Sequence, residues 1–263
     1  MLVQVLIYLL IGSVSGFFSG LLGIGGGIII VPSLFFTYFL LDIALVEPMH
    51  FAIGTSLAVM TVSSLWSIYR YHKKQAIFWS FFRNLKIPLF ISSFLGIVIS
   101  YHLSDDILIL GLSIITLILG IYFFLFSIIS RREKSLNIYI TVIIGLIIGL
   151  TSNIFGIGGG VIALPFFFTL LRIPNHSMIG TSELCTFITS AVGSLIFLIT
   201  GFHKVSNIDS IGFIHVSAFA ALTIASLISM SFGIKFQEKV NIKVFTKIFA
   251  VLLILISISF FFK

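Results

Sequence analysis

Ten apolar stretches, separated by short polar or glycine-rich breaks, follow one another along the 263-residue chain. Their approximate ranges are 2–22, 27–41, 51–69, 84–101, 106–129, 138–155, 160–171, 177–200, 210–232 and 242–262. Eight of them have a length near the roughly 20 apolar residues that a helix needs to cross a bilayer. The second and seventh, at about 15 and 12 residues and ~1.5 Å per residue, fall short of a ~30 Å hydrocarbon core. We therefore expect half-helices or strongly tilted pieces at these two places.

Composition agrees with a membrane environment. Apolar residues make up 59% of the chain and charged residues 9%, a balance that cannot cover a water-exposed surface. The first apolar stretch has no preceding positive charge and no cleavage site, so we expect a membrane helix there and not a cleaved signal. The sequence predicts a polytopic integral membrane protein without a separate soluble domain.

The chain contains an internal repeat. GIGGGIIIVP at residues 23–32 returns as GIGGGVIALP at residues 156–165, with 7 of 10 positions identical at an offset of 156 − 23 = 133. PMHFAIGTS at residues 48–56 returns as PNHSMIGTS at residues 174–182, at an offset of 174 − 48 = 126. We divide the chain accordingly into a first repeat, residues 1–134, and a second repeat, residues 135–263, within one membrane domain.

The loop charges predict how the repeats are oriented. Five segments per repeat is an odd number, so full reversal at each segment places the two copies in opposite orientations. Lys and Arg, which collect in cytoplasmic loops, concentrate in residues 70–86, 131–134 and 235–247. Counting reversals puts these loops on one face and both termini on the other. The predicted fold is an all-α polytopic transmembrane bundle of two inverted-topology repeats with Gly-broken or re-entrant helices.

The glycine-rich breaks are the candidate binding sites. Broken helices at matching positions of two halves point to a transport site, and the unpaired first amides of the following half-helix attract an anion. Consecutive glycines let those amides form a concave nest, although close helix packing is an alternative role. A nucleotide loop is excluded because no Lys-Ser/Thr pair follows. The candidate substrate-binding residues, with the hydroxyls of the second block, are Gly23, Gly25, Gly26, Gly27, Thr55, Ser56, Gly156, Gly158, Gly159, Gly160, Thr181 and Ser182.

Other polar residues in the apolar segments leave alternatives open. Thr55, Ser56 and their counterparts serve either as anion donors or as helix-to-helix hydrogen bonds. His50 and His176 are interfacial or capping residues, or ligand contacts. Glu183 stands where the first repeat has Leu57 (183 − 126 = 57). A carboxyl near the bilayer midplane indicates a proton relay or charge sensor, with a buried structural acid as the alternative.

Enzymatic signatures are missing from the sequence. No Gly-x-Ser-x-Gly motif and no His, Asp or Glu cluster with metal-ligand spacing occurs, and Cys185 is the sole cysteine. We therefore expect no catalytic residues, no metal and no cofactor. The net charge of +7 lies in short loops, which favours membrane orientation over nucleic-acid binding.

The paired GIGGG stretches followed by proline, with Gly-Thr-Ser farther on in each half, resemble the sulfite exporter TauE/SafE permeases over nearly the full chain. The resemblance implies seven to eight crossings with re-entrant short segments, and secondary transport of sulfite, sulfonates or related oxyanions across the inner (cytoplasmic) membrane. Expected partners are the small anion and the lipid bilayer, and a homo-oligomer is compatible with the sequence. The alternative function is a membrane enzyme or sensor that binds such an anion without translocating it.

Overall fold

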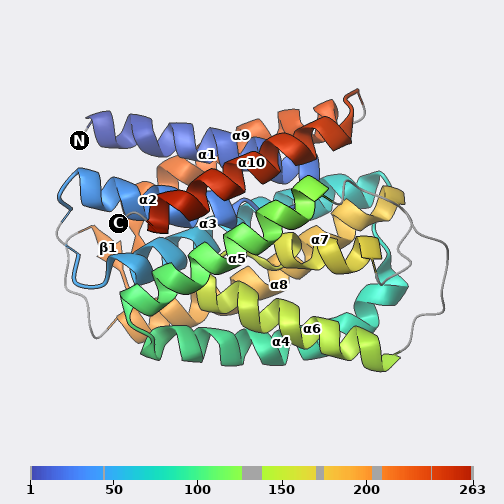
Figure 1. Ribbon diagram of the computed structural model, residues 1–263, viewed down its shortest axis with the longest axis horizontal. Coiled ribbons are helices and arrows are strands. Elements are labelled where there is room, and N and C mark those ends of the chain that lie inside the picture. Colours follow the sequence, from blue (N-terminus) through green and yellow to red (C-terminus); the bar gives the residue numbers. More distant parts are fainter. Residues whose placement is uncertain are drawn as a thin grey trace.

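The computed structural model describes residues 2–43, 45–125, 138–169, 175–202, 209–237 and 239–261. Within these ranges the chain forms ten helices and one short antiparallel hairpin (Figure 1). The elements are α1 (Leu2–Leu22), α2 (Gly27–Leu40), α3 (Pro48–Lys73), α4 (Trp79–His102), α5 (Asp105–Leu125), α6 (Ile138–Phe155), α7 (Gly159–Thr169), α8 (Asn175–Gly201), β1 (Ser210–Ile211), β2 (Ile214–His215), α9 (Val216–Phe236) and α10 (Ile242–Phe261). The boundary expected between residues 134 and 135 lies outside the described residues.

Eight of the helices in the described ranges are long and apolar enough to cross a membrane, whereas α2 and α7 are shorter. This confirms the all-α polytopic architecture and the position of the two short segments. One boundary prediction is wrong, because the segment expected to be helical from residue 210 begins with the β1–β2 hairpin. Gly212 turns the hairpin with a φ of 59°, which ends any helical path there, and α9 begins at Val216.

Large apolar side chains cover the outside of the bundle. Phe90 on α4, Ile118 on α5, Phe232 on α9 and Leu255 on α10 are all exposed. Many exposed large apolar side chains of this kind are unfavourable in water and favourable against lipid chains. The long axes of the helices run together along the length of the molecule, and both chain termini lie at the same end (Figure 1).

The packing joins helices from the two halves of the chain. Helix α1 lies along α9, α4 along α6, α5 along α10, and α3 against α8. Each of these pairs takes one helix from residues 1–134 and one from residues 135–263. The two halves therefore form one intertwined bundle and not two separate domains.

Glycines allow the closest of these helix contacts. A Cβ on Gly12 of α1 would lie 2.7 Å from the Leu222 carbonyl oxygen on α9, and a Cβ on Gly149 of α6 would lie 2.6 Å from the Leu89 carbonyl oxygen on α4. Small residues that bring backbones together are typical of helix interfaces in membranes. The repeat offset of 133 residues relates Gly12 to Gly145 and Gly16 to Gly149. All four glycines face the partner helix. The first helix of each half thus packs closely, through two glycines, against a helix of the other half.

Candidate functional site

Two glycine loops form the centre of the site. The first loop, residues 23–26, joins α1 to α2, and the second loop, residues 156–158, joins α6 to α7. Gly23, Gly25 and Gly26 have φ angles of 71°, 76° and 80°, and Gly156 and Gly158 have 66° and 81°. This left-handed backbone is open to glycine and strained for other residues. The repeated glycines are therefore required by the backbone shape of the two helix breaks.

The two loops, 133 residues apart in sequence, touch each other. A Cβ on Gly27 would lie 2.8 Å from the carbonyl oxygen of Gly156, and a Cβ on Gly160 would lie 2.5 Å from that of Gly23. The first residues of α2 and α7 thus pack directly against the opposite loop. The structure brings all of the candidate glycines to one buried place, which sequence spacing alone could not do.

Serine hydroxyls hold the loops in position. Ser182 Oγ on α8 donates a hydrogen bond to the Gly23 carbonyl oxygen at 2.8 Å, and Ser56 Oγ on α3 donates to the Gly156 carbonyl oxygen at 3.1 Å. Both serines are fully buried. Each half therefore supplies the serine that fixes the loop of the other half, and in this structure these hydroxyl protons face protein acceptors.

The threonines of the same motif accept hydrogen bonds from backbone amides at the starts of other helices. Thr55 Oγ1 accepts the His215 backbone N–H at 3.0 Å, at the start of α9, and Thr181 Oγ1 accepts the Phe78 backbone N–H at 3.0 Å, at the start of α4. Thr181 also donates to the Ser177 carbonyl oxygen at 2.6 Å. The Gly-Thr-Ser motif thus links α3 and α8 to both the loops and the neighbouring helix starts. These bonds are the helix-to-helix role that the sequence left open beside anion binding.

The amides at the start of α7 have side-chain caps. The Gly159 N–H donates to Thr189 Oγ1 and the Gly160 N–H donates to Thr186 Oγ1, each at 2.9 Å. By contrast, α2 begins after Gly26 without a side-chain cap. Sequence reasoning missed both threonines, although their spacing of three residues on one helix places them on one face and was a usable signal.

Glu183 reaches the first loop from α8. Its side chain is fully buried, and Ser19 on α1 donates a hydrogen bond to Oε1 at 3.2 Å. The Gly25 backbone N–H also interacts with the carboxyl group. The second oxygen, Oε2, has no hydrogen-bond partner among the described residues. A polar atom buried in this way is costly, so the carboxyl marks the first loop as a place of unsatisfied hydrogen bonding.

His50 is part of a helix junction. Its Nδ1 lies 3.0 Å from Asp105 Oδ1, and its Nε2 lies 3.1 Å from the Ser100 carbonyl oxygen, to which it donates. The Met49 backbone N–H donates to Asp105 Oδ2 at 3.1 Å. His50 thus ties the start of α3 to α4 and α5, with both ring nitrogens engaged. The side chain of His176 lies outside the described residues.

His215 lies next to the start of α9. Its Nε2 is 3.3 Å from Asp209 Oδ2, and its Nδ1 is 3.4 Å from the Tyr8 hydroxyl. Burial lowers the pKa of the His215 imidazole, and the nearby Asp209 carboxylate opposes that shift. A lowered pKa favours the neutral imidazole near neutral pH, so His215 adds little positive charge to this end of the bundle.

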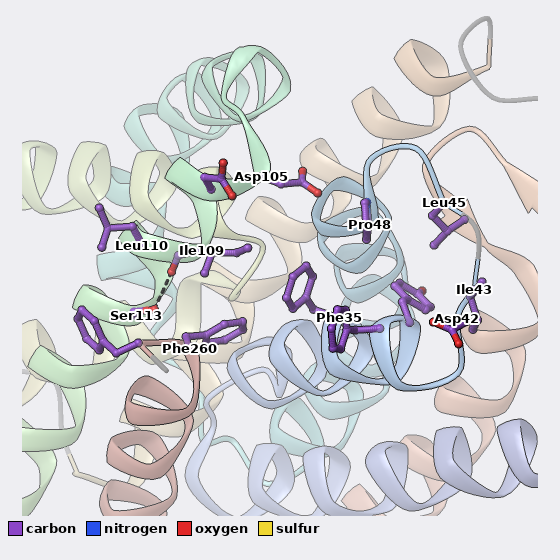
Figure 2. Close-up of a pocket in the computed structure, with 14 residues that line it drawn as sticks. Phe35, Asp42, Ile43, Leu45, Pro48, Asp105, Ile109, Leu110, Ser113 and Phe260 are labelled. Atoms are coloured by element: carbon purple, nitrogen blue, oxygen red, sulfur yellow. Dashed lines mark hydrogen bonds between the residues drawn. The ribbon is translucent and has the colours of Figure 1, made fainter. Parts of the chain in front are cut away.

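A separate cavity of about 660 Å³ opens between the α2–α3 connection, the start of α5 and the end of α10 (Figure 2). Three carboxylates, those of Asp42, Asp105 and Asp106, line it together with aromatic rings. The full lining is Phe35, Tyr38, Phe39, Asp42, Ile43, Leu45, Pro48, Asp105, Asp106, Ile109, Leu110, Ser113, Phe260 and Phe261. Among the described lining residues there are three acidic side chains and no basic one, an arrangement that repels an anion, so the glycine loops and not this cavity are the candidate anion site.

Comparison with known proteins decides the family. The sequence profile described as sulfite exporter TauE/SafE matches residues 8–260. The chain belongs to this family. It is therefore a membrane transporter of the TauE/SafE family, and the resemblance drawn from the paired glycine motifs is confirmed.

Relatives in this family come from distant organisms. The chain is 31% identical to a "Probable membrane transporter protein" of Haemophilus influenzae, over 98% of each chain. It is 29% identical to a protein of the same description from Methanocaldococcus jannaschii, over 89% of this chain and 87% of that one. The Bacillus subtilis relative, "Probable membrane transporter protein YunE", is 26% identical over 74% of this chain and 78% of its own length. No solved structure matches the chain.

Proposed function

We propose that this protein is a secondary transporter that carries a small sulfur-containing oxyanion, such as sulfite or an organosulfonate, across the cytoplasmic membrane. The observation that carries the proposal is the meeting of two glycine-broken helix starts inside the membrane bundle. Backbone N–H groups and the positive end of a helix dipole stabilise an anion without a buried cation. A tetrahedral or pyramidal oxyanion presents several acceptor oxygens to such a nest.

We further propose that the two halves are inverted-topology repeats whose rocking exposes the loops to each side in turn. The pairing of the helices supports this. In the repeat α6 corresponds to α1 and α4 corresponds to α9, so the α1–α9 contact and the α6–α4 contact are the same contact with the two halves exchanged. The serine bonds support it as well, since Ser56 and Gly156 occupy the places of Ser182 and Gly23. Such a relation gives two equivalent gates around one central site.

A flux measurement tests the function. Purified protein in proteoliposomes is expected to take up radiolabelled sulfite or methanesulfonate faster than protein-free liposomes do. Sulfate and chloride serve as competing anions that rank the specificity. Binding of these anions without any flux would contradict transport and favour the sensor or enzyme alternative.

The orientation has its own test. Tags placed in the α3–α4 connection, at Lys74, and in the α9–α10 connection, at Lys239, are expected to report the same, cytoplasmic face. The physical reason is the basic character of both connections, which lie at the end opposite the two chain termini (Figure 1). Labelling of introduced cysteines with a membrane-impermeant reagent in intact cells measures this. Finding the two positions on opposite faces would rule out inverted repeats.

A further inference from the structure

The two glycine loops have nearly the same sequence but different surroundings. Helix α7 begins with two amides that are already bonded to Thr186 and Thr189 of α8. In the first repeat the equivalent positions on α3 are Met60 (186 − 126 = 60) and Ser63 (189 − 126 = 63). Met60 offers a thioether, a weak acceptor, and the Ser63 hydroxyl bonds its own helix at the Met60 carbonyl oxygen. Among the described residues, threonine caps are therefore found at the second loop and not at the first.

Met60 lies where a cap for α2 would have to be. Its sulfur and methyl group would be 2.6 Å and 2.5 Å from a Cβ on Gly27, the first residue of α2. Gly26 has no side chain that could cap α2, and no side chain among the described residues accepts from the first amides of α2, so these amides keep their capacity to donate to a ligand. The side chain that replaces threonine here offers only a weakly accepting sulfur and no hydroxyl, and so competes poorly for those donors.

A second observation at the same loop points to the ligand. The Glu183 carboxyl lies against the Gly25 N–H and the Ser19 hydroxyl, with Oε2 buried and without a partner among the described residues. At the mirrored position of the second loop stands Leu57, and there the Ser152 hydroxyl, the counterpart of Ser19, has no partner in the described structure. The chain thus places an oxygen-bearing acid at the uncapped loop and an apolar residue at the capped one.

We infer that the transported oxyanion binds at the start of α2, at the first glycine loop alone, and that the Glu183 carboxyl is a tethered competitor for the same donors. This inference rests on the proposed transport function and specifies where in the molecule the anion binds. A carboxylate and a sulfur oxyanion both accept hydrogen bonds from amides through negatively charged oxygens. The two cannot both be charged at one buried nest, since like charges at short range in a poorly polarisable interior repel strongly.

Within the described part of the chain, the groups that hydrogen-bond to the Glu183 carboxyl carry no charge. Helix α1 contributes Ser19 and the loop contributes Gly25, neither of which titrates in the accessible range. On α8 itself, Cys185 is the titratable neighbour whose charge interacts with Glu183 in the described structure. The carboxyl is therefore the group whose ionisation changes the charge at the first loop.

Binding of methanesulfonate and sulfite to the purified full-length protein tests this inference. Equilibrium dialysis is performed from mildly acidic to mildly alkaline pH. Methanesulfonate keeps one charge state over this range, so a change in its affinity reports on the protein. Wild-type affinity is expected to fall as pH rises, whereas Glu183→Gln and Glu183→Ala are expected to bind about tenfold or more tightly at the alkaline end, without pH dependence. Thermal stability and a monodisperse elution profile verify that the variants fold.

Matched variants separate the two loops. Met60→Thr introduces at α2 the kind of cap that Thr186 gives to α7. It is expected to weaken methanesulfonate binding about tenfold relative to Met60→Leu, which changes the side-chain shape without adding a hydroxyl. Leu57→Ala at the mirrored position controls for a loss of side-chain volume and is expected to bind like wild type.

Three results would each overturn the inference. They are unchanged affinity and pH response in both Glu183 variants, equal binding by Met60→Thr and Met60→Leu, and no binding of either anion by wild type. Binding as expected without flux in proteoliposomes would instead contradict the proposed function and leave the site assignment standing.

Discussion

Replacing Gly25 or Gly158 by leucine is expected to abolish anion flux in proteoliposomes. Both glycines have a left-handed backbone, which costs a residue with a Cβ about 1–2 kcal/mol. A Cβ on Gly25 would lie 2.6 Å from Thr186 Cγ2, and one on Gly158 would lie 2.6 Å from Met60 Sδ. Each added side chain would have to displace one of the two loops, which pack against each other at the proposed site. We expect flux to fall at least about tenfold with alanine and below detection with leucine.

A control glycine distinguishes loop geometry from ordinary packing. Gly145 on α6 has a regular helical backbone, and its Cβ would meet flexible or ring carbons of Leu85 and Pro88 at 3.1 Å. Gly145→Ala is therefore expected to retain most of the flux, with only a modest loss of thermal stability. If Gly25→Ala and Gly158→Ala insert normally and transport as well as Gly145→Ala does, the loop glycines serve packing and not binding.

Much of this architecture could be predicted from the sequence because a bilayer leaves few choices. Apolar run length fixes the helices, and the repeated GIGGG stretch located both helix breaks and both short helices. The family also followed from those residues. The hairpin before α9 could not be read in this way, because Ile211, Phe213 and Ile214 are as apolar as a membrane helix and hydropathy does not report the turn at Gly212.

The bonding within the site was less accessible to sequence reasoning. The motif residues Thr55, Ser56, Thr181 and Ser182 are fully buried in the bundle, but their hydrogen-bond partners come from elements far away in the chain. Ser182, for example, bonds Gly23 across 159 residues, a contact set by how α8 crosses the first loop. Thr186 and Thr189 were missed because hydroxyls on apolar helices usually bond their own backbone, and their three-residue spacing places them on one helix face without indicating which amides they accept from.

The difference between the halves has a functional consequence that symmetry alone would not give. Two identical nests would hold two anions, and their charges would oppose each other across a short distance. Threonine caps at α7 and Met60 at α2 leave one nest open, while Glu183 supplies a negative group that this nest holds when no anion is bound. At a single site where the anion and the ionised Glu183 carboxylate exclude each other, binding of one anion is coupled to uptake of one proton.

Glu183→Gln is therefore expected to separate anion transport from the pH gradient. In the wild-type protein a bound anion penalises the ionised carboxyl beside it, so proton uptake and anion binding favour each other, and each must do so by the same factor. Glutamine keeps the size and hydrogen-bonding capacity of the protonated acid but cannot release a proton. Anion exchange across the membrane should continue in the variant, whereas acceleration of uptake by an inward proton gradient, expected to be about tenfold or more in the wild type, should be lost.

The measurement compares uptake of labelled methanesulfonate into proteoliposomes with and without an imposed pH difference, at a fixed internal pH. Ser152→Ala is the matched control, because Ser152 is the buried counterpart of Ser19 near the second loop, where the position equivalent to Glu183 is the apolar Leu57 of α3. That variant should keep the full response to the gradient. Ser19→Ala, which removes the hydroxyl that bonds Glu183 Oε1, should shift the pH at which uptake is half-maximal without removing the response.

Wild-type gradient dependence in Glu183→Gln would show that the acid is structural and that another group carries the proton. His50, with both ring nitrogens already bonded in the α3–α5 junction, would then be the first residue to replace.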